Sequence, residues 1–338
     1  MSFDETGRGW RWDVEAIRRK GYTDNVADLM AGRLRRLPEA AREVLRVAAC
    51  LGHTAELRVL APACGRTEGE AEADLWPAVT EGLGDAIQFA RYAPLVRAKG
   101  GRVLLECPEP LRTLFQTLSG VDELLPEGAG ATKACDCHAP LMSLPRLLHT
   151  TLATVPADVP YLEADPTLVE QWRGRLASRG GFKVGVAWQG NPHHKWDRWR
   201  SVPLALFAPL AEVPGVSLVN LQQGPGSEQL PTLRGRFDVL DVGTELGAAP
   251  GAWANVAAVM ACLDLVVSVD TATAHLAGAL GVPVWVPLPT LVDWRWLLGR
   301  EDSPWYPTMR LLRQKLLGDW EPVFQRMADA LAKLARGE

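Results

Sequence analysis

The spacing of apolar residues divides the chain into a helical beginning and a remainder in which strands and helices alternate. Apolar positions between residues 26 and 34 recur at helical spacing, and two further short helices are expected over residues 38–51 and 68–79. Their outer faces are polar and carry no catalytic constellation. We therefore expect residues 1–81 to form a small helical segment with a structural or partner-binding role.

From residue 82 the pattern changes to short apolar runs separated by amphipathic stretches. The expected elements are, in order, helix 87–98 with a kink or early stop at Pro94, strand 102–106, helix 108–118 and strand 121–125. This alternation is typical of a parallel sheet covered by helices. Residues 126–166 are rich in proline and long for a simple connection, which suggests a functional loop.

A second unit of the same kind begins near residue 181. Its expected strands cover residues 184–188, 216–221, 265–269 and 282–286, and its expected helices cover 204–211, 255–262, a stretch ending at 280, and 320–334. The predicted fold class is therefore α/β, with two domains of parallel sheet at 82–180 and 181–315 and a C-terminal helix at 316–338.

Composition restricts the function classes. The formal net charge of −4 argues against a general nucleic-acid binder, which needs an excess of basic residues. No run approaches 18 apolar residues, so no membrane span is expected. The polar start lacks the apolar region of a signal peptide, and we expect a cytoplasmic protein.

Several common cofactor and metal patterns are missing. The sequence has no G-x-x-x-x-G-K-[ST] loop and no G-x-G-x-x-G after a strand, which argues against P-loop ATPases and dinucleotide-dependent dehydrogenases. The run 135–138 (Cys-Asp-Cys-His) lacks a second pair of ligands, and no Asp-x-Asp pair is present to hold a metal diphosphate. We therefore predict no metal site and no cofactor.

The sharpest local pattern is a strand, a turn and a helix over residues 268–275. Asp270 ends the buried strand, Thr271 and Ala272 are small, and His275 follows one turn into the helix. Small residues let phosphates approach the free N–H groups of a helix N-terminus, whose dipole favours negative charge. The alternative is a helix capped by Asp270, with His275 as a buried core residue.

A second loop, residues 188–201, leaves another strand at the same edge of the sheet. It contains a dense set of hydrogen-bond donors, including Gly190, Asn191, Lys195, Arg198, Arg200 and Ser201. Such a set suits a diphosphate, which arginine binds through two nitrogens. The alternative is a solvated basic loop.

A third element, residues 82–92, places Asp85 near the start of a helix after two glycines. A carboxylate there is well placed as a general base. It can equally be a simple helix cap.

Taken together, several blocks in residues 82–335 resemble bacterial glycosyltransferases of the GT-B kind, related to the heptosyltransferases and often found behind tetratricopeptide repeats. The blocks that carry the resemblance are 84–92, 138–145, 159–162, 185–192, 197–201, 269–281, 293–296 and 302–307. The resemblance implies a pair of Rossmann-type domains and transfer of a sugar from a nucleotide-diphosphate donor with inversion. The substrates would be the nucleotide sugar and an unknown acceptor, a protein or a glycan.

The resemblance also implies roles for particular residues. Asp85 would be the acceptor-facing base, and the basic loop would neutralise the leaving diphosphate in place of a metal. The donor site would comprise Gly190, Asn191, Lys195, Arg198, Arg200, Ser201, Gln222, Asp270, Thr271, Ala272 and His275. The acceptor side would comprise Gly84, Gln88, Arg91 and His138.

The chain departs from this family before residue 82. Relatives have a strand, usually ending in Glu-Gln-Gly, before the Gly-Asp turn, and residues 75–82 do not match it. Residues 1–81 are instead similar to the helical segment that follows the ATPase core of large signalling ATPases. We therefore expect a fusion with its junction at 81–82 and an acceptor-side domain without its first strand. The alternative function is a non-catalytic nucleotide-sugar-binding protein with an N-terminal helical interaction module.

Overall fold

The computed structural model describes residues 2–4, 9–11, 62–66, 82–127, 129, 133–192, 194, 196–233, 235–248 and 251–338 of the chain. The chain divides into two compact units, Met1–Ala78 and Val79–Glu338. In the first unit, strands β1 (Ser2–Asp4) and β2 (Gly9–Arg11) pair in antiparallel fashion. The three helices expected in this unit lie outside the described residues. The expected junction at 81–82 is described only from residue 82 onward.

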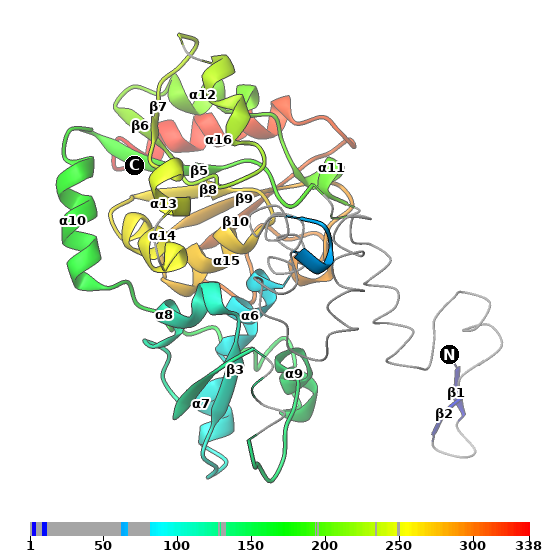
Figure 1. Cartoon of the computed structure of the whole chain (residues 1–338). Helices are drawn as coiled ribbons and strands as arrows, with labels where there is room; N and C mark the ends of the chain where they lie inside the picture. The colour runs from blue at the N-terminus through cyan, green and yellow to red at the C-terminus, as the bar shows by residue number, and fades with distance from the viewer. Residues whose placement is uncertain are drawn as a thin grey trace. The chain divides into compact units, whose positions relative to one another are not determined.

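The second unit is built on a six-stranded parallel sheet (Figure 1). Its strands are β5 (Phe182–Ala187), β6 (Val216–Asn220), β7 (Val239–Asp241), β8 (Leu265–Ser268), β9 (Val284–Leu288) and β10 (Met309–Arg313). The spatial order is β10-β9-β8-β5-β6-β7, so the first and fourth strands in sequence lie side by side. Such a sheet binds ligands outside the carboxyl ends of the strands where the order reverses, which here is between β5 and β8.

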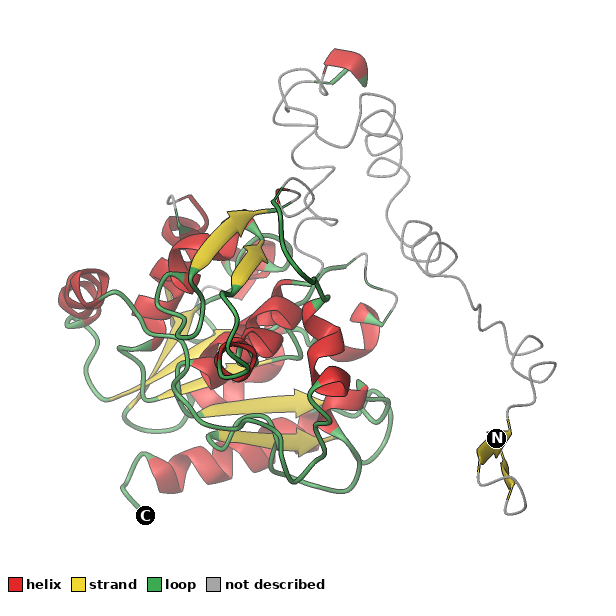
Figure 2. Ribbon diagram, turned by 90° about the horizontal axis from the view of Figure 1, so that it is seen from below, coloured by secondary structure: helices red, strands yellow, loops and turns green. Residues whose placement is uncertain are grey.

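Helices cover both faces of this sheet (Figure 1). The elements between and after the strands are α10 (Pro166–Leu176), α11 (Asp197–Arg200), η4 (Leu204–Phe207), α12 (Ala208–Ala211), η5 (Ser227–Gln229), η6 (Pro231–Leu233), α13 (Gly243–Ala248), α14 (Ala252–Met260), α15 (Ala272–Ala279), η7 (Trp294–Trp296) and α16 (Glu321–Leu334). Figure 2 shows α16, the helix before the C-terminus, running alongside the strands.

The alternation of side chains along β8 explains why two separate layers of core form. Leu265 and Val267 belong to one buried cluster, which includes Phe207 and Phe324 from the α12 and α16 side. Val266 belongs to the other cluster, on the α14 and α15 side. Because successive strand residues point to opposite faces, an uninterrupted apolar run such as β8 is suited to a sheet buried on both faces.

Residues 82–165, called the small lobe here, contain a second and much smaller parallel sheet. Their elements are α6 (Leu83–Ala90), α7 (Ala93–Arg97), β3 (Leu104–Cys107), η1 (Glu109–Leu111), α8 (Arg112–Phe115), β4 (Glu123–Pro126), η3 (Leu141–Ser143) and α9 (Leu144–Leu147). Within the described residues, β3 pairs only with β4, in parallel register. A partner strand from residues 76–81 would lie outside them.

The small lobe and the six-stranded sheet share one hydrophobic core. Ile87 and Phe89 of α6 belong to the same buried cluster as Leu276 of α15. A Cβ added to Gly84 would lie 3.0 Å from the His275 ring and 3.5 Å from the Ala272 Cα. Glycine therefore permits the close approach of α6 to the first turn of α15.

The expected α/β class with parallel sheets is confirmed. The helix expected over 87–98 is two helices, because the chain turns before Pro94 and that proline opens α7. The elements that were not predicted include the strands β1, β2, β7 and β10 and the helices α9, α10, α11 and α13. The β7 strand has only three residues, and β10 mixes apolar residues with arginines in the order Met-Arg-Leu-Leu-Arg.

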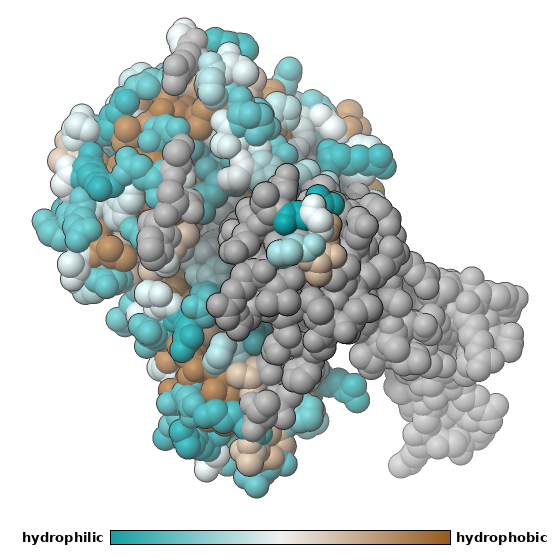
Figure 3. All heavy atoms as spheres, in the orientation of Figure 1, coloured by the Kyte–Doolittle hydropathy of each residue, from teal (hydrophilic) through white to brown (hydrophobic). Residues whose placement is uncertain are grey.

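The described surface on the face of Figure 3 is mostly hydrophilic, with small hydrophobic patches between the polar groups. Within the part of the chain that the structure describes, no helix has the length and apolarity needed to cross a membrane.

Gly278 tests how tightly α15 is packed. A Cβ at this position would lie 2.4 Å from the ring of the buried Tyr306. We expect Gly278→Ala to lower the free energy of unfolding by about 1–3 kcal/mol through overpacking, measured by urea denaturation. The matched control is Gly174→Ala in α10, where a Cβ meets open space. This control should raise stability by roughly 0.5–1 kcal/mol, and equal losses in both variants would contradict the packing argument.

Candidate functional site

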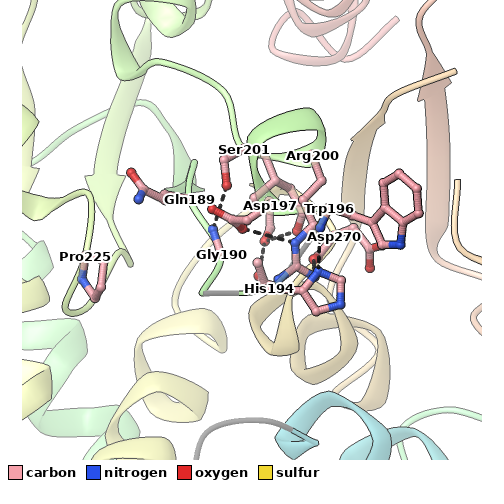
Figure 4. Close-up of polar contacts among 12 residues, drawn as sticks. Gln189, Gly190, His194, Trp196, Asp197, Arg200, Ser201, Pro225 and Asp270 are labelled. Carbon is pink, nitrogen blue, oxygen red and sulfur yellow. Dashed lines mark hydrogen bonds and ion pairs between the residues drawn. The ribbon is translucent and has the colours of Figure 1, made fainter. Parts of the chain in front are cut away.

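The candidate site lies at the carboxyl ends of β5 and β8, where Ala187 and Ser268 are paired across the sheet. The loops that leave these two strands are the two donor-rich loops identified in the sequence. Figure 4 shows that Arg200 of the first loop reaches across to Asp270 of the second. Its Nη1 donates to the Asp270 carbonyl oxygen at 2.8 Å, so one arginine joins both loops.

The first loop is folded around a buried ion pair. Arg200 Nε donates to Asp197 Oδ1 at 3.2 Å, and both side chains are largely buried. The Gly190 N–H donates to Ser201 Oγ at 3.0 Å (Figure 4). A Cβ at Gly190 would lie 2.5 Å from Asp197 Oδ1 and 2.7 Å from Arg200 Nη2, so only glycine leaves room for the pair. Burial raises the pKa of Asp197, and the nearby Arg200 opposes this shift.

Gln222 ties the neighbouring loop to this one. Its side-chain oxygen accepts from the N–H groups of Trp188 at 3.0 Å and Gln189 at 2.9 Å. Its Nε2 donates to three backbone carbonyl groups, those of Gln189, Gln223 and Pro225. Gln222 was expected in the donor site, but both ends of its side-chain amide are bonded to the backbone. Its evident role is to fix the shape of the site.

The second loop leads into an open helix N-terminus. Thr271 is the N-cap of α15, in extended conformation and without a side-chain capping bond, and its Oγ1 lies 3.2 Å from Ser268 Oγ. The N–H groups of Ala272 and Thr273 find no acceptor among the described residues, and both residues are partly exposed. Asp270 is therefore not the cap that the sequence offered as an alternative. The first turn of α15 is suited to receive an anion.

His275 lies deeper in the same helix and is almost fully buried. Its Nδ1 lies 3.0 Å from the Tyr306 hydroxyl, and its ring stacks on Trp296 with centroids 5.4 Å apart. Burial lowers its pKa to about 3, and the charges of Arg91 and Arg200 add to the shift. His275 is therefore neutral at ordinary pH. The sequence left two roles open for His275, a phosphate contact or a buried core residue, and this environment matches the second.

The helix α6, which was expected on the acceptor side, brings Asp85 and Gln88 to the same place. Asp85 forms an ion pair with Arg295, and Gln88 Oε1 accepts from Arg295 Nε at 2.6 Å. The N-cap of α6 is Gly82, so Asp85 lies in the first turn of the helix rather than at its cap. Arg295 also donates from Nη1 to Asp293 Oδ1 at 2.8 Å. The simple capping role offered as an alternative for Asp85 is therefore not what the structure shows.

Arg91, expected on the acceptor side, is buried and serves to hold the lobes together. Its guanidinium donates to the carbonyl oxygens of Gln88, Pro156 and Trp305 and to the Tyr161 hydroxyl. Its charge also lies 4.4 Å from the centre of the Tyr306 ring. Four of its five N–H groups have these partners and the residue is buried, so Arg91 is better placed to support the packing than to contact a substrate.

The remaining expected residues have varied positions. Lys195 lies outside the described residues, and Asn191 is partly buried at the start of its loop. Arg198 is exposed, with its guanidinium 4.7 Å from the centre of the Trp199 ring. His138 is exposed in a stretch without regular structure. Of the predicted set, the structure thus brings the α6, β5 and β8 residues together, and it does not connect His138 with them.

Burial shifts the charge balance at this edge. Burial raises the pKa of Asp270, and the nearby Asp293 carboxylate adds to the rise while Arg200 and Trp296 oppose it. Burial also raises the pKa of Asp293. Arg295 has its pKa lowered to about 10 by burial, so it remains a cation at neutral pH. Among the described residues, no group of three or more His, Cys, Asp or Glu is arranged to hold a metal.

Arg295 and Asp293 were not among the site residues predicted from the sequence. They lie in the loop that follows β9, where Asp293 caps the short helix η7 by accepting from the Arg295 N–H at 3.1 Å. The available signal was the run of charged and aromatic residues 293–296 a few positions after an apolar strand. A loop at the carboxyl end of a parallel strand is a place where ligand-contacting residues are expected.

Comparison with known proteins adds to this picture. No protein-family model matches the chain. Protein FlbA of Caulobacter vibrioides is 31% identical over 278 residues, which cover 75% of this chain and 46% of FlbA. The chain thus spans about half the length of this curated relative.

Two solved structures match most of this chain at low sequence identity. The glycosyl transferase family 9 structure from Veillonella parvula DSM 2008 matches with a TM-score of 0.53 at 15% identity, over 75% of this chain and 94% of that one. The ADP-heptose lps heptosyltransferase II of E. coli matches with a TM-score of 0.49 at 15% identity, over 77% of this chain and 96% of that one. The Veillonella match shows a shared fold, and the expected GT-B-like class is confirmed.

Gln222→Glu tests whether this residue shapes the loops. The substitution removes the donor that serves three carbonyl groups and puts a carboxylate beside them. We expect the free energy of unfolding to fall by about 2–4 kcal/mol in urea titrations, because buried acceptors lose their partner. The adjacent Gln223→Glu is the control, since only the backbone oxygen of Gln223 takes part. Unchanged stability in Gln222→Glu would show that the amide is not structural.

His275 makes stability depend on pH. Its pKa is about 3 in the folded chain and about 6.5 when unfolded, so between these values only the unfolded state binds the proton. Stability is therefore full above pH 6.5 and is lost as the pH falls toward 3. We expect the free energy of unfolding of the wild type, relative to that of His275→Gln, to fall by about 2–3 kcal/mol from pH 7.5 to 4.5, measured by urea unfolding. A constant difference would mean that His275 titrates normally.

Proposed function

We propose that this chain is an inverting, metal-independent glycosyltransferase that uses a nucleotide-diphosphate-sugar donor. The observation that supports this most strongly is the meeting of α6 and α15 through their first turns. The packing brings Asp85, a carboxylate with a third of its side chain exposed, to the helix N-terminus that offers free N–H groups. The fold shared with the Veillonella family 9 glycosyl transferase is consistent with this use of the site.

The donor diphosphate would bind at the first turn of α15. The Ala272 and Thr273 N–H groups and the positive end of the helix dipole suit its negative charge. Arg198 is exposed and able to turn toward the ligand, whereas Arg200 is already held by Asp197 and Asp270. Lys195 is proposed for the same role on the basis of its place in the sequence. In this arrangement, N–H groups and guanidinium groups neutralise the leaving group as a metal otherwise would.

The reaction would be a single displacement. The acceptor hydroxyl oxygen attacks the anomeric carbon and gives its proton to the Asp85 carboxylate. The bond from the anomeric carbon to the diphosphate oxygen breaks, and its electron pair leaves with the nucleoside diphosphate. Attack on the side opposite the leaving group inverts the anomeric centre.

The acceptor would be a protein or a glycan hydroxyl, with the N-terminal unit as an interaction module. We also propose that the chain acts in the cytoplasm and that its N-terminal unit derives from a signalling ATPase by fusion. The relation of the catalytic half to glycosyltransferases found behind tetratricopeptide repeats belongs to the same proposal. The match to FlbA covers less than half of that protein, so its biological role does not define this chain's acceptor.

A second candidate function is favoured by one observation. Asp85 is paired with Arg295, which lowers the basicity of a carboxylate. A protein that binds nucleotide sugars without transferring them would also fit an occupied carboxylate of this kind. Turnover and binding must therefore be measured separately.

Asp85→Asn separates the two functions. We expect nucleotide release from the best substrate in a panel of nucleotide sugars to fall about 100-fold or more, because the proton acceptor is lost. The dissociation constant of the matching nucleotide, measured by calorimetry, should stay within about twofold. The fold should also persist, because Arg295 keeps its bonds to Asp293 and Gln88.

The control is Glu109→Gln, a highly exposed carboxylate in the same lobe. It should leave nucleotide release unchanged. Nucleotide binding without release, with Asp85→Asn indistinguishable from wild type, would favour the second candidate. If no nucleoside monophosphate or diphosphate binds at all, the donor site itself is excluded.

A further inference from the structure

Arg295 connects the two halves of the proposed site. It comes from the loop after β9, yet Nη2 of its guanidinium pairs with Oδ1 of Asp85 on α6. The other nitrogens donate to Gln88 on the same face of α6 and to Asp293 in its own loop. The side chain of Arg295 is 11% exposed, so these bonds form away from bulk water. Buried guanidinium groups with three carboxylate or amide partners hold a fixed orientation.

The loop that carries Arg295 is itself held rigidly. The Arg295 carbonyl accepts from Trp305 Nε1 at 3.2 Å, and its guanidinium lies 4.8 Å from the centre of the Trp294 ring. At the end of η7, Leu297 adopts a φ of 53°, a conformation that L-residues rarely take. Such strain is maintained only where the surroundings impose it, and it is found preferentially near functional sites.

The pairing leaves one half of the Asp85 carboxylate open. Arg295 occupies Oδ1, and Oδ2 has no hydrogen-bond partner among the described residues. A third of the Asp85 side chain remains exposed. A buried donor also lies nearby, because Gln88 is fully buried and its Nε2 has no hydrogen-bond partner in the part of the chain that the structure describes. The geometry therefore presents a carboxylate with one fixed and one available oxygen.

We propose that Arg295 is the positioning residue of the transfer reaction: it fixes Oδ1 of Asp85 so that Oδ2 faces the acceptor hydroxyl. This inference rests on the proposed function, in which Asp85 is the base. Arg295 belongs to the donor half of the molecule, so the base of the acceptor half is aligned by the half that holds the donor. One side chain thereby aligns the base with the half of the molecule that holds the donor.

The proposal has a measurable electrostatic consequence. A guanidinium beside a carboxylate favours the ionised form and lowers its pKa, so removal of Arg295 raises the pKa of Asp85. Asp293 pairs with the same guanidinium, so without Arg295 the cluster would hold two carboxylates that have lost their shared cation. A smaller fraction of Asp85 is then ionised in mild acid. The acid limb of the rate profile must therefore move to higher pH.

The experiment compares wild type with Arg295→Gln and Arg295→Lys. Carbon-13 NMR of aspartate carboxyl groups gives the titration midpoint of Asp85, with its signal identified by loss in Asp85→Asn. We expect the midpoint to rise by about one pH unit or more in Arg295→Gln. It should rise by less in Arg295→Lys, which keeps the positive charge but not the planar guanidinium with its several N–H donors. The acid limb of nucleotide release should shift by a similar amount, while the nucleotide dissociation constant changes less than twofold.

The matched control is Arg313→Gln. Arg313 also supports this loop, through a bond from Nη2 to the Trp296 carbonyl at 2.5 Å, but it does not touch Asp85. The proposal is overturned if the Asp85 midpoint is the same in Arg295→Gln as in wild type, or if Arg313→Gln moves it equally. A wild-type chain that releases no nucleotide overturns the proposed function and the positioning role together. An unchanged midpoint in an active chain overturns the positioning role alone.

Discussion

The close approach of α6 to the first turn of α15 is the constraint on which the rest of the site depends. Gly84 of α6 permits that contact, and Gly278 of α15 leaves room for the ring of Tyr306. Once the two helices meet, a carboxylate from the small lobe lies beside the anion-attracting end of a helix from the six-stranded sheet. The groups proposed to take part in the reaction come from separate segments of the chain, and the packing of the two helices brings them together.

The charge balance follows from the same packing. Arg200 and Arg295 each donate hydrogen bonds to carboxylate and carbonyl oxygens, so both guanidinium groups already have acceptors within the protein. Burying these two arginines costs them their solvation by water. Their bonds in the folded chain fix the arrangement of their partners, and this contributes more to the geometry of the site than to its affinity for a ligand. On the proposed function, an incoming anion would bind to backbone N–H groups and to exposed side chains such as Arg198. The buried arginines would then determine the shape of the site, and the exposed groups would contact the ligand.

The sequence predicted well where local chemistry determines structure. The strand before Gln189 and the strand and helix around Asp270 were recognised from apolar runs ending in small or polar residues, and the structure places both at one edge. It missed β7 and β10, because three residues or a mixed pattern give no periodic signal. It also missed the partner of Asp85, because that contact spans about two hundred residues of sequence. Pairings of this kind arise only from tertiary structure, and the same holds for the burial of Arg91 and Gln222.

The continuous core between the small lobe and the sheet has a consequence for how the molecule unfolds. A two-stranded sheet such as β3 with β4 has too little apolar surface to be stable alone, and its helices pack directly on α14 and α15. The small lobe therefore cannot melt as an independent body while the sheet stays intact, nor can it serve as a freely hinged flap. Residues 82–338 should behave as one cooperative unit. Local openings would be confined to the loops at the sheet edge, which is where the proposed substrates would enter.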